Sequence, residues 1–260
     1  MKSKSGIYLP IVFFSIFILV GLAPPAHVRA DEKADRVKAL LEQGWAFEGQ
    51  MHVDLANLDK AIAVHKEALA LAPDNDEAMW RLAEVIFKKS EAVTDKKERK
   101  AMVERTVLLA EQALAVNPTS VGGMYWAGTA HARLADMSGL FSAAGQVKQA
   151  KVCLHRAIDT DPNHRLAVLS GVILAKIYSE SPWPIKDMEQ ALNLARWAVA
   201  KDPNLTLAGL TLGRILLAKN ETAAARTELN RCLTTEHPTY VWDAVLYDWP
   251  EAKTVLAGIK

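Results

Sequence analysis

Histidine and cysteine are the side chains best suited to metal binding or nucleophilic chemistry, and in this sequence they are scattered. Apart from His27 near the N-terminus, the histidines stand singly, as His52, His65, His131, His155, His164 and His237. A zinc site needs several ligands close together. The sequence also has no phosphate loop, no dinucleotide-binding glycine pattern and no H-E-x-x-H pair. It therefore predicts a protein that is not an enzyme and has no metal or cofactor.

Nine residues at matched spacing could instead bind a ligand. Four are apolar and recur as Trp80, Tyr125, Val172 and Leu210. Four residues further on, and so on the same helical face, stand Glu84, Thr129, Lys176 and Arg214, with Arg133 one turn beyond Thr129. An apolar ladder with basic groups to one side suits an elongated ligand with an acidic head, or a hydrophobic segment of a partner.

The alternative is that this ladder is ordinary core. The segment from Tyr240 contains Trp242, Tyr247 and Trp249 and could cover it, closing the last repeat as a cap. His65 also lies on an apolar helix face, where a core histidine is expected rather than a metal ligand.

The spacing of these residues comes from an internal repeat. Prolines punctuate the chain in similar contexts, at Pro73, Pro118, Pro162, Pro203 and Pro238. Short residues recur twelve and five positions before the first four prolines: Ala61 and Ala68, Thr106 and Ala113, Ala150 and Ala157, Ala191 and Ala198. Because positions seven apart share a helical face, each unit contains a helix that ends just before its proline.

A second helix follows each proline, with small residues at Ala83, Gly128 and Gly213, ten positions on. After Pro162 the matching residue is Ala175, which predicts three extra residues in that unit. The units are also longer than the usual 34 residues or so of a tetratricopeptide (TPR) repeat. The extra length, before Ala101 and before Val147, forms either loops or helix extensions.

These observations predict an all-α protein, a TPR-like solenoid of about five helix hairpins with a C-terminal capping segment. In the turn Ser181-Pro182-Trp183-Pro184, Trp183 either plugs the gap between paired helices or acts at the mouth of the groove. Cys153 and Cys232 lie two repeats apart, about 20 Å by helix-packing distances, so we expect free thiols, with Cys232 in a small-residue core position.

The N-terminus has the pattern of an export signal. Lys2 and Lys4 precede the apolar run 11–22, and Val28 and Ala30 suit a cleavage site before Asp31. We therefore expect a signal peptide over 1–30, a helical domain over 31–260 and a periplasmic location. The alternative is an uncleaved anchor near the minimum spanning length. From Asp31 on, 28 basic and 30 acidic residues argue against nucleic acid as a partner.

The sequence from about Ala34 to Pro238, and most clearly from Met124 to Asn204, resembles a specific family, the T component (TatT) of tripartite ATP-independent periplasmic (TRAP) transporters. The likeness lies in Tyr125, Trp126, Gly139, Lys148, Arg156-Ala157, the 181–184 turn, Lys186-Asp187 and Ala191. It implies a periplasmic homotrimer that binds the transporter's substrate-binding (P) subunit and an apolar small molecule. This chain lacks the acylated Cys of many members. The eukaryotic regulator of microtubule dynamics family has a similar repeat layout, and the export signal makes it the weaker match.

The sequence thus favours a periplasmic, non-catalytic accessory subunit of a TRAP-type solute transporter. The alternative is a general TPR scaffold of the cell envelope that holds peptide segments of other proteins. An enzyme on a helical array has no residues to support it.

Overall fold

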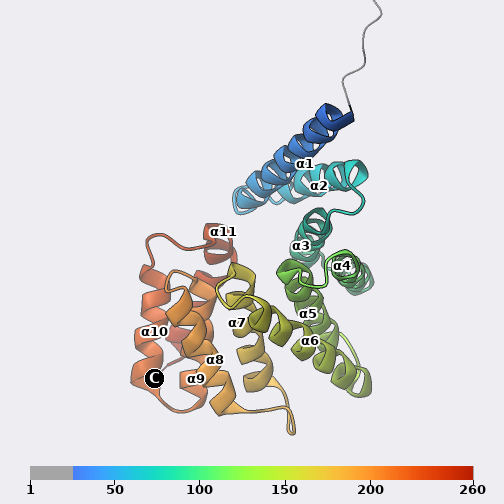
Figure 1. Cartoon of the computed structure of the whole chain (residues 1–260). Coiled ribbons are helices and arrows are strands. Elements are labelled where there is room, and N and C mark those ends of the chain that lie inside the picture. Colours follow the sequence, from blue (N-terminus) through green and yellow to red (C-terminus); the bar gives the residue numbers. More distant parts are fainter. Residues whose placement is uncertain (1–25, 260) are drawn as a thin grey trace, which may run out of the picture.

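A computed structural model describes residues 26–259, and the regular secondary structure of this range is entirely helical (Figure 1). Ten helices pair in chain order as antiparallel hairpins: α1 (Ala26–Gly49) with α2 (Asn57–Leu71), α3 (Asp76–Ala92) with α4 (Lys96–Val116), α5 (Val121–Asp136) with α6 (Leu140–Thr160), α7 (Arg165–Glu180) with α8 (Met188–Lys201), and α9 (Thr206–Ala218) with α10 (Thr222–Thr234). The hairpins follow one another in an arc, and the predicted TPR-like solenoid is confirmed.

The prolines lie in the short loops that join one hairpin to the next. α2 ends at Leu71 and α4 at Val116, in each case two residues before the proline. The following helix is capped by a side chain that accepts a backbone N–H: Asn75 from Ala78 at 2.7 Å and Ser120 from Gly123 at 3.3 Å. The predicted helix ends before the prolines are confirmed.

The extra length of the repeats is helical. α4 and α6 have 21 residues each, against 15 in α2 and 13 in α10. Of the two alternatives for the segments before Ala101 and Val147, helix extension is therefore the correct one.

The unit after Pro162 has no extra residues ahead of its helix, which corrects the predicted register. α7 begins at Arg165, three residues after its proline, as α3, α5 and α9 do. Counted from these helix starts, the position equivalent to Trp80 and Tyr125 is Leu169. Val172 lies about one turn further along the same face.

Small residues let the two helices of a hairpin touch. A Cβ atom on Gly128 would lie 2.6 Å from Leu154 Cγ, and one on Gly213 would lie 2.7 Å from Leu229 Cγ. The first hairpin makes the same contact between Gly44 and the ring of His65. The short residues predicted on the even-numbered helices, Ala61 to Ala198, are all completely buried. The repeat signal in the sequence is thus the packing of odd on even helices.

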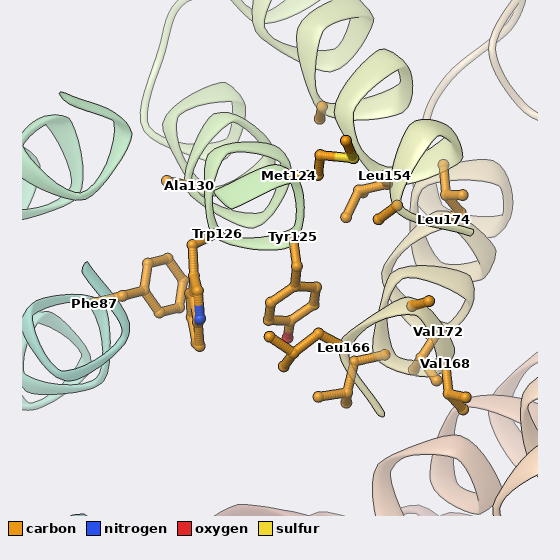
Figure 2. Close-up of a cluster of buried hydrophobic side chains, with 14 of the residues drawn as sticks. Phe87, Met124, Tyr125, Trp126, Ala130, Leu154, Leu166, Val168, Val172 and Leu174 are labelled. Carbon is orange, nitrogen blue, oxygen red and sulfur yellow. The ribbon is translucent and has the colours of Figure 1, made fainter. Parts of the chain in front are cut away.

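One large hydrophobic cluster runs through successive hairpins, with a smaller cluster in the first hairpin and another in the last. Figure 2 shows its centre, where Tyr125 and Trp126 of α5 lie between Phe87 of α3 and apolar side chains of α6 and α7. Phe87 and Trp126 have ring centroids 5.5 Å apart. Because each odd-numbered helix contacts the next, burial is continuous along the arc.

After α10 the chain crosses to the other end of the arc and returns. Residues 240–248, here called the C-terminal strap, contain α11 (Val241–Asp243) and a π-helical turn, η1 (Ala244–Asp248). Trp242 reaches the first hairpin, where its ring lies 3.5 Å from the position of a Cβ on Gly49. α12 (Trp249–Gly258) packs on α9 and α10, and Trp249 Nε1 donates to the Cys232 carbonyl at 2.9 Å. The predicted C-terminal cap is this helix.

Both cysteines are free thiols, and Cys232 is completely buried. Burial raises the pKa of the Cys232 thiol to about 12. Trp183 is 87% exposed, so the expectation that it plugs the gap between α7 and α8 is wrong.

The predicted signal peptide lies mostly outside the described residues, and the cleavage site after Ala30 falls within α1. The boundary at 30/31 and the periplasmic location stay predictions. None of the helices in the described range is long and apolar enough to cross a membrane.

The packing of α5 on α6 gives a first prediction. Gly128→Val should lower the free energy of unfolding by about 1–3 kcal/mol, because the added methyl groups overlap Leu154. Gly145→Val, on the exposed side of α6 with nothing within 4 Å of a Cβ, should stay within about 0.5 kcal/mol of the wild type. Urea unfolding of both variants measures the difference, and equal stabilities would refute this account of the repeat.

His65 gives a second prediction. Burial lowers its pKa to about 4, from an ordinary value near 6.5. Below pH 6.5 the unfolded chain therefore binds more protons than the folded one, and stability falls as the pH drops toward 4. Leu154 and Leu229 occupy the equivalent position in two other hairpins, so leucine should fit in place of His65. His65→Leu should therefore reduce the loss of stability at low pH by up to about 3 kcal/mol. Urea midpoints at pH 7 and pH 4.5 test it, and an unchanged difference between the two pH values would contradict it.

Candidate functional site

The odd-numbered helices form an inner face. α3 contacts α5, α5 contacts α7 and α7 contacts α9, in addition to the contacts within each hairpin. All nine residues predicted to bind a ligand lie on these helices: Trp80 and Glu84 on α3, Tyr125, Thr129 and Arg133 on α5, Val172 and Lys176 on α7, and Leu210 and Arg214 on α9.

The structure divides these nine residues by exposure. Six are buried: Trp80, Glu84, Tyr125, Thr129, Val172 and Leu210. Lys176 is half-buried, Arg214 is exposed, and Arg133 forms a 2.7 Å ion pair with Glu91. Most of the apolar ladder thus lies below the surface, and only part of the set is available to a ligand.

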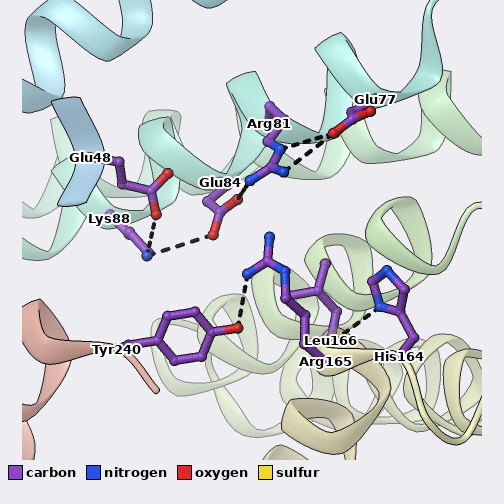
Figure 3. A network of polar contacts seen from close by, with 9 residues as sticks. All are labelled: Glu48, Glu77, Arg81, Glu84, Lys88, His164, Arg165, Leu166 and Tyr240. Carbon is purple, nitrogen blue, oxygen red and sulfur yellow. Dashed lines mark hydrogen bonds and ion pairs between the residues drawn. The ribbon is translucent and has the colours of Figure 1, made fainter. Parts of the chain in front are cut away.

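A buried ionic cluster lies where the strap meets the inner face (Figure 3). Lys88 of α3 pairs with Glu48 of α1 and lies 3.6 Å from Glu84. Arg165, the first residue of α7, donates from Nη1 to the Tyr240 hydroxyl at 2.8 Å. The cluster joins α1, α3, α7 and the strap. Its side chains do not stand at equivalent positions of the repeat.

The charges in this cluster depend on one another. Burial, followed by the negative charge of Glu84, raises the pKa of Glu48. Burial would also raise the pKa of Glu84, but the cations Lys88, Arg165 and Arg81 lower it below its ordinary value. Glu84 therefore keeps its negative charge, and removing any of these cations would leave a buried carboxylate poorly neutralised.

Aromatic rings surround the same cations. The guanidinium carbons of Arg81 and Arg165 lie 4.8 Å and 4.6 Å from the centroid of the Trp45 ring. Arg81 also lies 4.4 Å from the Trp80 ring. Trp242 packs edge-on against Trp45, with centroids 5.2 Å apart. Cation–π contacts of this kind fix the orientation of both guanidinium groups.

Two hollows open on the inner face. The larger, here called the Trp80 hollow, has a volume of about 360 Å³ and is lined by Asp76, Glu77, Trp80, Arg81, Asn117, Thr119, Ser120, Val121, Gly122, His164 and Arg165. The smaller, of about 140 Å³, lies between α7, α9 and α12 and includes the predicted Lys176, Leu210 and Arg214. Trp80 is the predicted residue that lines the larger hollow. No group of three or more His, Cys, Asp or Glu side chains within residues 26–259 is arranged to hold a metal ion.

Several residues at this site were not found from the sequence. Trp45 and Glu48 precede the first repeat proline, so the register does not reach them. Lys88 stands four residues after Glu84, a spacing that places both on one helical face and could have identified it. Arg165 opens its helix, ahead of the positions that the repeat pattern selects.

The family relationship follows from a comparison with known protein families. The sequence model of the family described as "Regulator of microtubule dynamics protein 1-3" (RMD1-3) matches residues 46–244. The chain belongs to this family. The match extends from the end of α1 to the strap and includes the buried ionic cluster. Among curated proteins no match is found.

Solved structures show the fold. A protein described as the thermophilic TPR protein TTC0263 from Thermus thermophilus superposes with a TM-score of 0.64 and 18% identity, over 85% of this chain and 99% of that one. The pilF protein of Pseudomonas aeruginosa gives a TM-score of 0.57 and 14% identity, over 86% and 90%. At these identities the likeness is one of helical-repeat architecture.

The RMD1-3 match corrects the resemblance to the TRAP transporter T component. The assignment to TatT was wrong, and with it the role in a TRAP-type transporter, the P subunit as partner, and the apolar ligand and homotrimer that the resemblance implied. Four of the residues that suggested TatT serve helix packing in any such solenoid: Tyr125, Trp126, Ala157 and Ala191 are all buried. The predicted export signal wrongly ranked the RMD family second, because a leader carries no information about the domain that follows it.

The strap gives a third prediction. Trp242→Ala should destabilise the chain by about 3–5 kcal/mol, because the ring is 7% exposed and packs on Trp45 and Gly49. It should also speed proteolysis between α10 and α12. Trp183→Ala is the matched control, with an expected change within about 0.5 kcal/mol. Urea unfolding and limited chymotrypsin digestion, which can cut after Tyr240 and Tyr247, measure both effects. Equal behaviour of the two variants would show that the strap does not close the arc.

Proposed function

We propose that this chain is a non-catalytic scaffold that binds a polypeptide segment of a partner protein on its inner face. Membership of the RMD1-3 family and the TPR-like fold support a scaffold. The observation that carries the proposal is the Trp80 hollow, where side chains from α3, α5 and α7 meet at one open surface. A ligand there contacts three successive repeats at once, as an extended peptide can.

The chemistry of the rim suits a peptide backbone. Asp76 and Glu77 offer acceptors, Asn117 and Thr119 offer both donors and acceptors, and Trp80 provides an apolar floor. A peptide main chain needs partners for its N–H and C=O groups along its length, and this rim provides them. The name of the family suggests microtubules, or proteins that act on them, as the partners of this scaffold.

Blocking the hollow tests the proposal. Thr119 is exposed at the rim, so Thr119→Trp should fill the opening with little effect on the fold. Peptides selected from a random display library on the wild-type chain should bind this variant at least about tenfold more weakly, since the indole occupies their site. Fluorescence anisotropy with labelled peptides measures the affinity. Co-sedimentation of the full chain with polymerised tubulin tests the suggested partner.

Gln112→Trp, on the exposed surface of the outer helix α4, is the matched control and should bind like the wild type. Circular dichroism checks that both variants fold. If selected peptides bind Thr119→Trp as tightly as the wild type, the partner segment does not lie in the Trp80 hollow.

A further inference from the structure

Arg165 is a largely buried guanidinium that helps to neutralise Glu84 but has no anion in direct contact. Its Nη1 donates to the neutral hydroxyl of Tyr240, and its Nη2 is buried with no hydrogen-bond partner within residues 26–259. No ion pair among the described residues includes it. A guanidinium removed from water is stabilised by an acceptor for each of its N–H groups, and the Nη2 of Arg165 lacks one.

The carboxylates close to Arg165 are already engaged. Glu48 and Glu84 lie beside Lys88, and Glu77 accepts from Arg81 at 3.2 Å. Asp76 accepts from Asn117 Nδ2 at 3.1 Å. None of them is in ion-pair contact with Arg165.

Arg81 of α3 pairs with Glu77 and Glu84, but it too has one nitrogen without a hydrogen bond. Its Nη1 is buried and makes no hydrogen bond to a described residue, and the nearest carboxylate oxygen, on Glu84, lies 3.8 Å away. Both arginines line the Trp80 hollow, and both stack on the ring of Trp45. Two guanidinium groups with incompletely used N–H donors therefore share one hollow. Planar carboxylates match such N–H groups with short, charge-assisted hydrogen bonds.

We propose that the Trp80 hollow receives a carboxylate of the bound partner segment, held by Arg165 and Arg81. The carboxylate belongs either to an Asp or Glu side chain or to the C-terminus of the partner. This inference rests on the proposed function and specifies the chemistry that the scaffold recognises.

The rim favours one carboxylate on a peptide over a polyanion. Asp76 and Glu77 line the hollow and repel an extended array of negative charge such as an anionic lipid surface. The same two acids can accept from the backbone N–H groups that accompany a peptide carboxylate. A single negative group flanked by amide donors is therefore complementary to the hollow.

The probe is a fluorescein-labelled peptide obtained by display selection on the full chain. Matched versions have each Asp or Glu changed to Asn or Gln, or the C-terminal carboxylate converted to an amide. One of these changes should weaken binding at least about tenfold, as expected for the loss of a charge-assisted hydrogen bond. Which version loses affinity distinguishes a side-chain carboxylate from a C-terminal one.

Arg165→Gln should weaken binding of the parent peptide by a similar factor. It should not change the affinity of the amide version that binds weakly, because that version no longer uses the charge. Arg165→Lys should recover only part of the affinity, since an ammonium lacks the planar pair of donors. Binding of every amide version as tight as that of the parent would overturn the inference. So would an equal loss of affinity on Arg165→Gln for the parent and for the amide version that binds weakly.

Two control variants separate this role from a structural one. Tyr240→Phe removes the hydrogen bond between Arg165 and the strap while leaving the guanidinium in place, and it should retain parent-peptide binding. Loss of binding in this variant equal to that in Arg165→Gln would assign the effect to the strap and sink the proposal. Arg105→Gln, at an exposed position of the outer helix α4, should bind like the wild type.

The two proposals fail in different ways. If Thr119→Trp abolishes peptide binding but the amide peptides bind as well as the parent, the scaffold function stands and the carboxylate inference falls. If Thr119→Trp binds every peptide normally, the proposed site itself is wrong. If the chain binds vesicles of phosphatidylserine and phosphatidylcholine through Arg165 and binds none of the peptides, the ligand of the hollow is a lipid headgroup and the peptide proposal is wrong.

Discussion

The close contact between the two helices of each hairpin is the constraint on which the rest of this structure depends. Gly128 against Leu154, Gly213 against Leu229 and Gly44 against His65 bring helix backbones close enough that a single Cβ would overlap. This contact fixes how each odd-numbered helix lies on its even-numbered partner. The stacking of hairpins then follows, and with it the inner face on which side chains from distant parts of the sequence meet.

The strap changes what this inner face can do. In an open solenoid, Trp80 and Tyr125 would line an accessible groove, but here Tyr240 and Trp242 pack among α1, α3 and α7 and bury the central part. The cluster of Glu48, Glu84 and Lys88 lies beneath the strap. Each of its buried charges depends on the oppositely charged partners around it. The Trp80 hollow stays open beside the strap, and its composition is more polar than the sequence pattern suggested.

The fold could be predicted because its signal is local. Short residues at fixed distances from Pro73 to Pro203 report helix contacts within about 40 residues, and periodicity makes them visible. The site could be predicted only in part, because it depends on contacts that no period relates. Lys88 with Glu48 and Arg165 with Tyr240 join positions 40 and 75 residues apart. The family was assigned wrongly in part because buried side chains that serve helix packing, such as Tyr125 and Ala157, look alike in unrelated solenoids.

The strap also alters how this molecule should lose its structure. Helical arrays with free ends are quasi-one-dimensional, so their terminal units fray while the middle stays ordered. Here the segment after α10 bonds to α7 and packs on α1, which turns a row of units into a closed loop of contacts. Neither end can melt without exposing the other. A chain built from repeats then unfolds as one cooperative unit. A partner that loosens the strap would weaken the packing of both the first and the last helices.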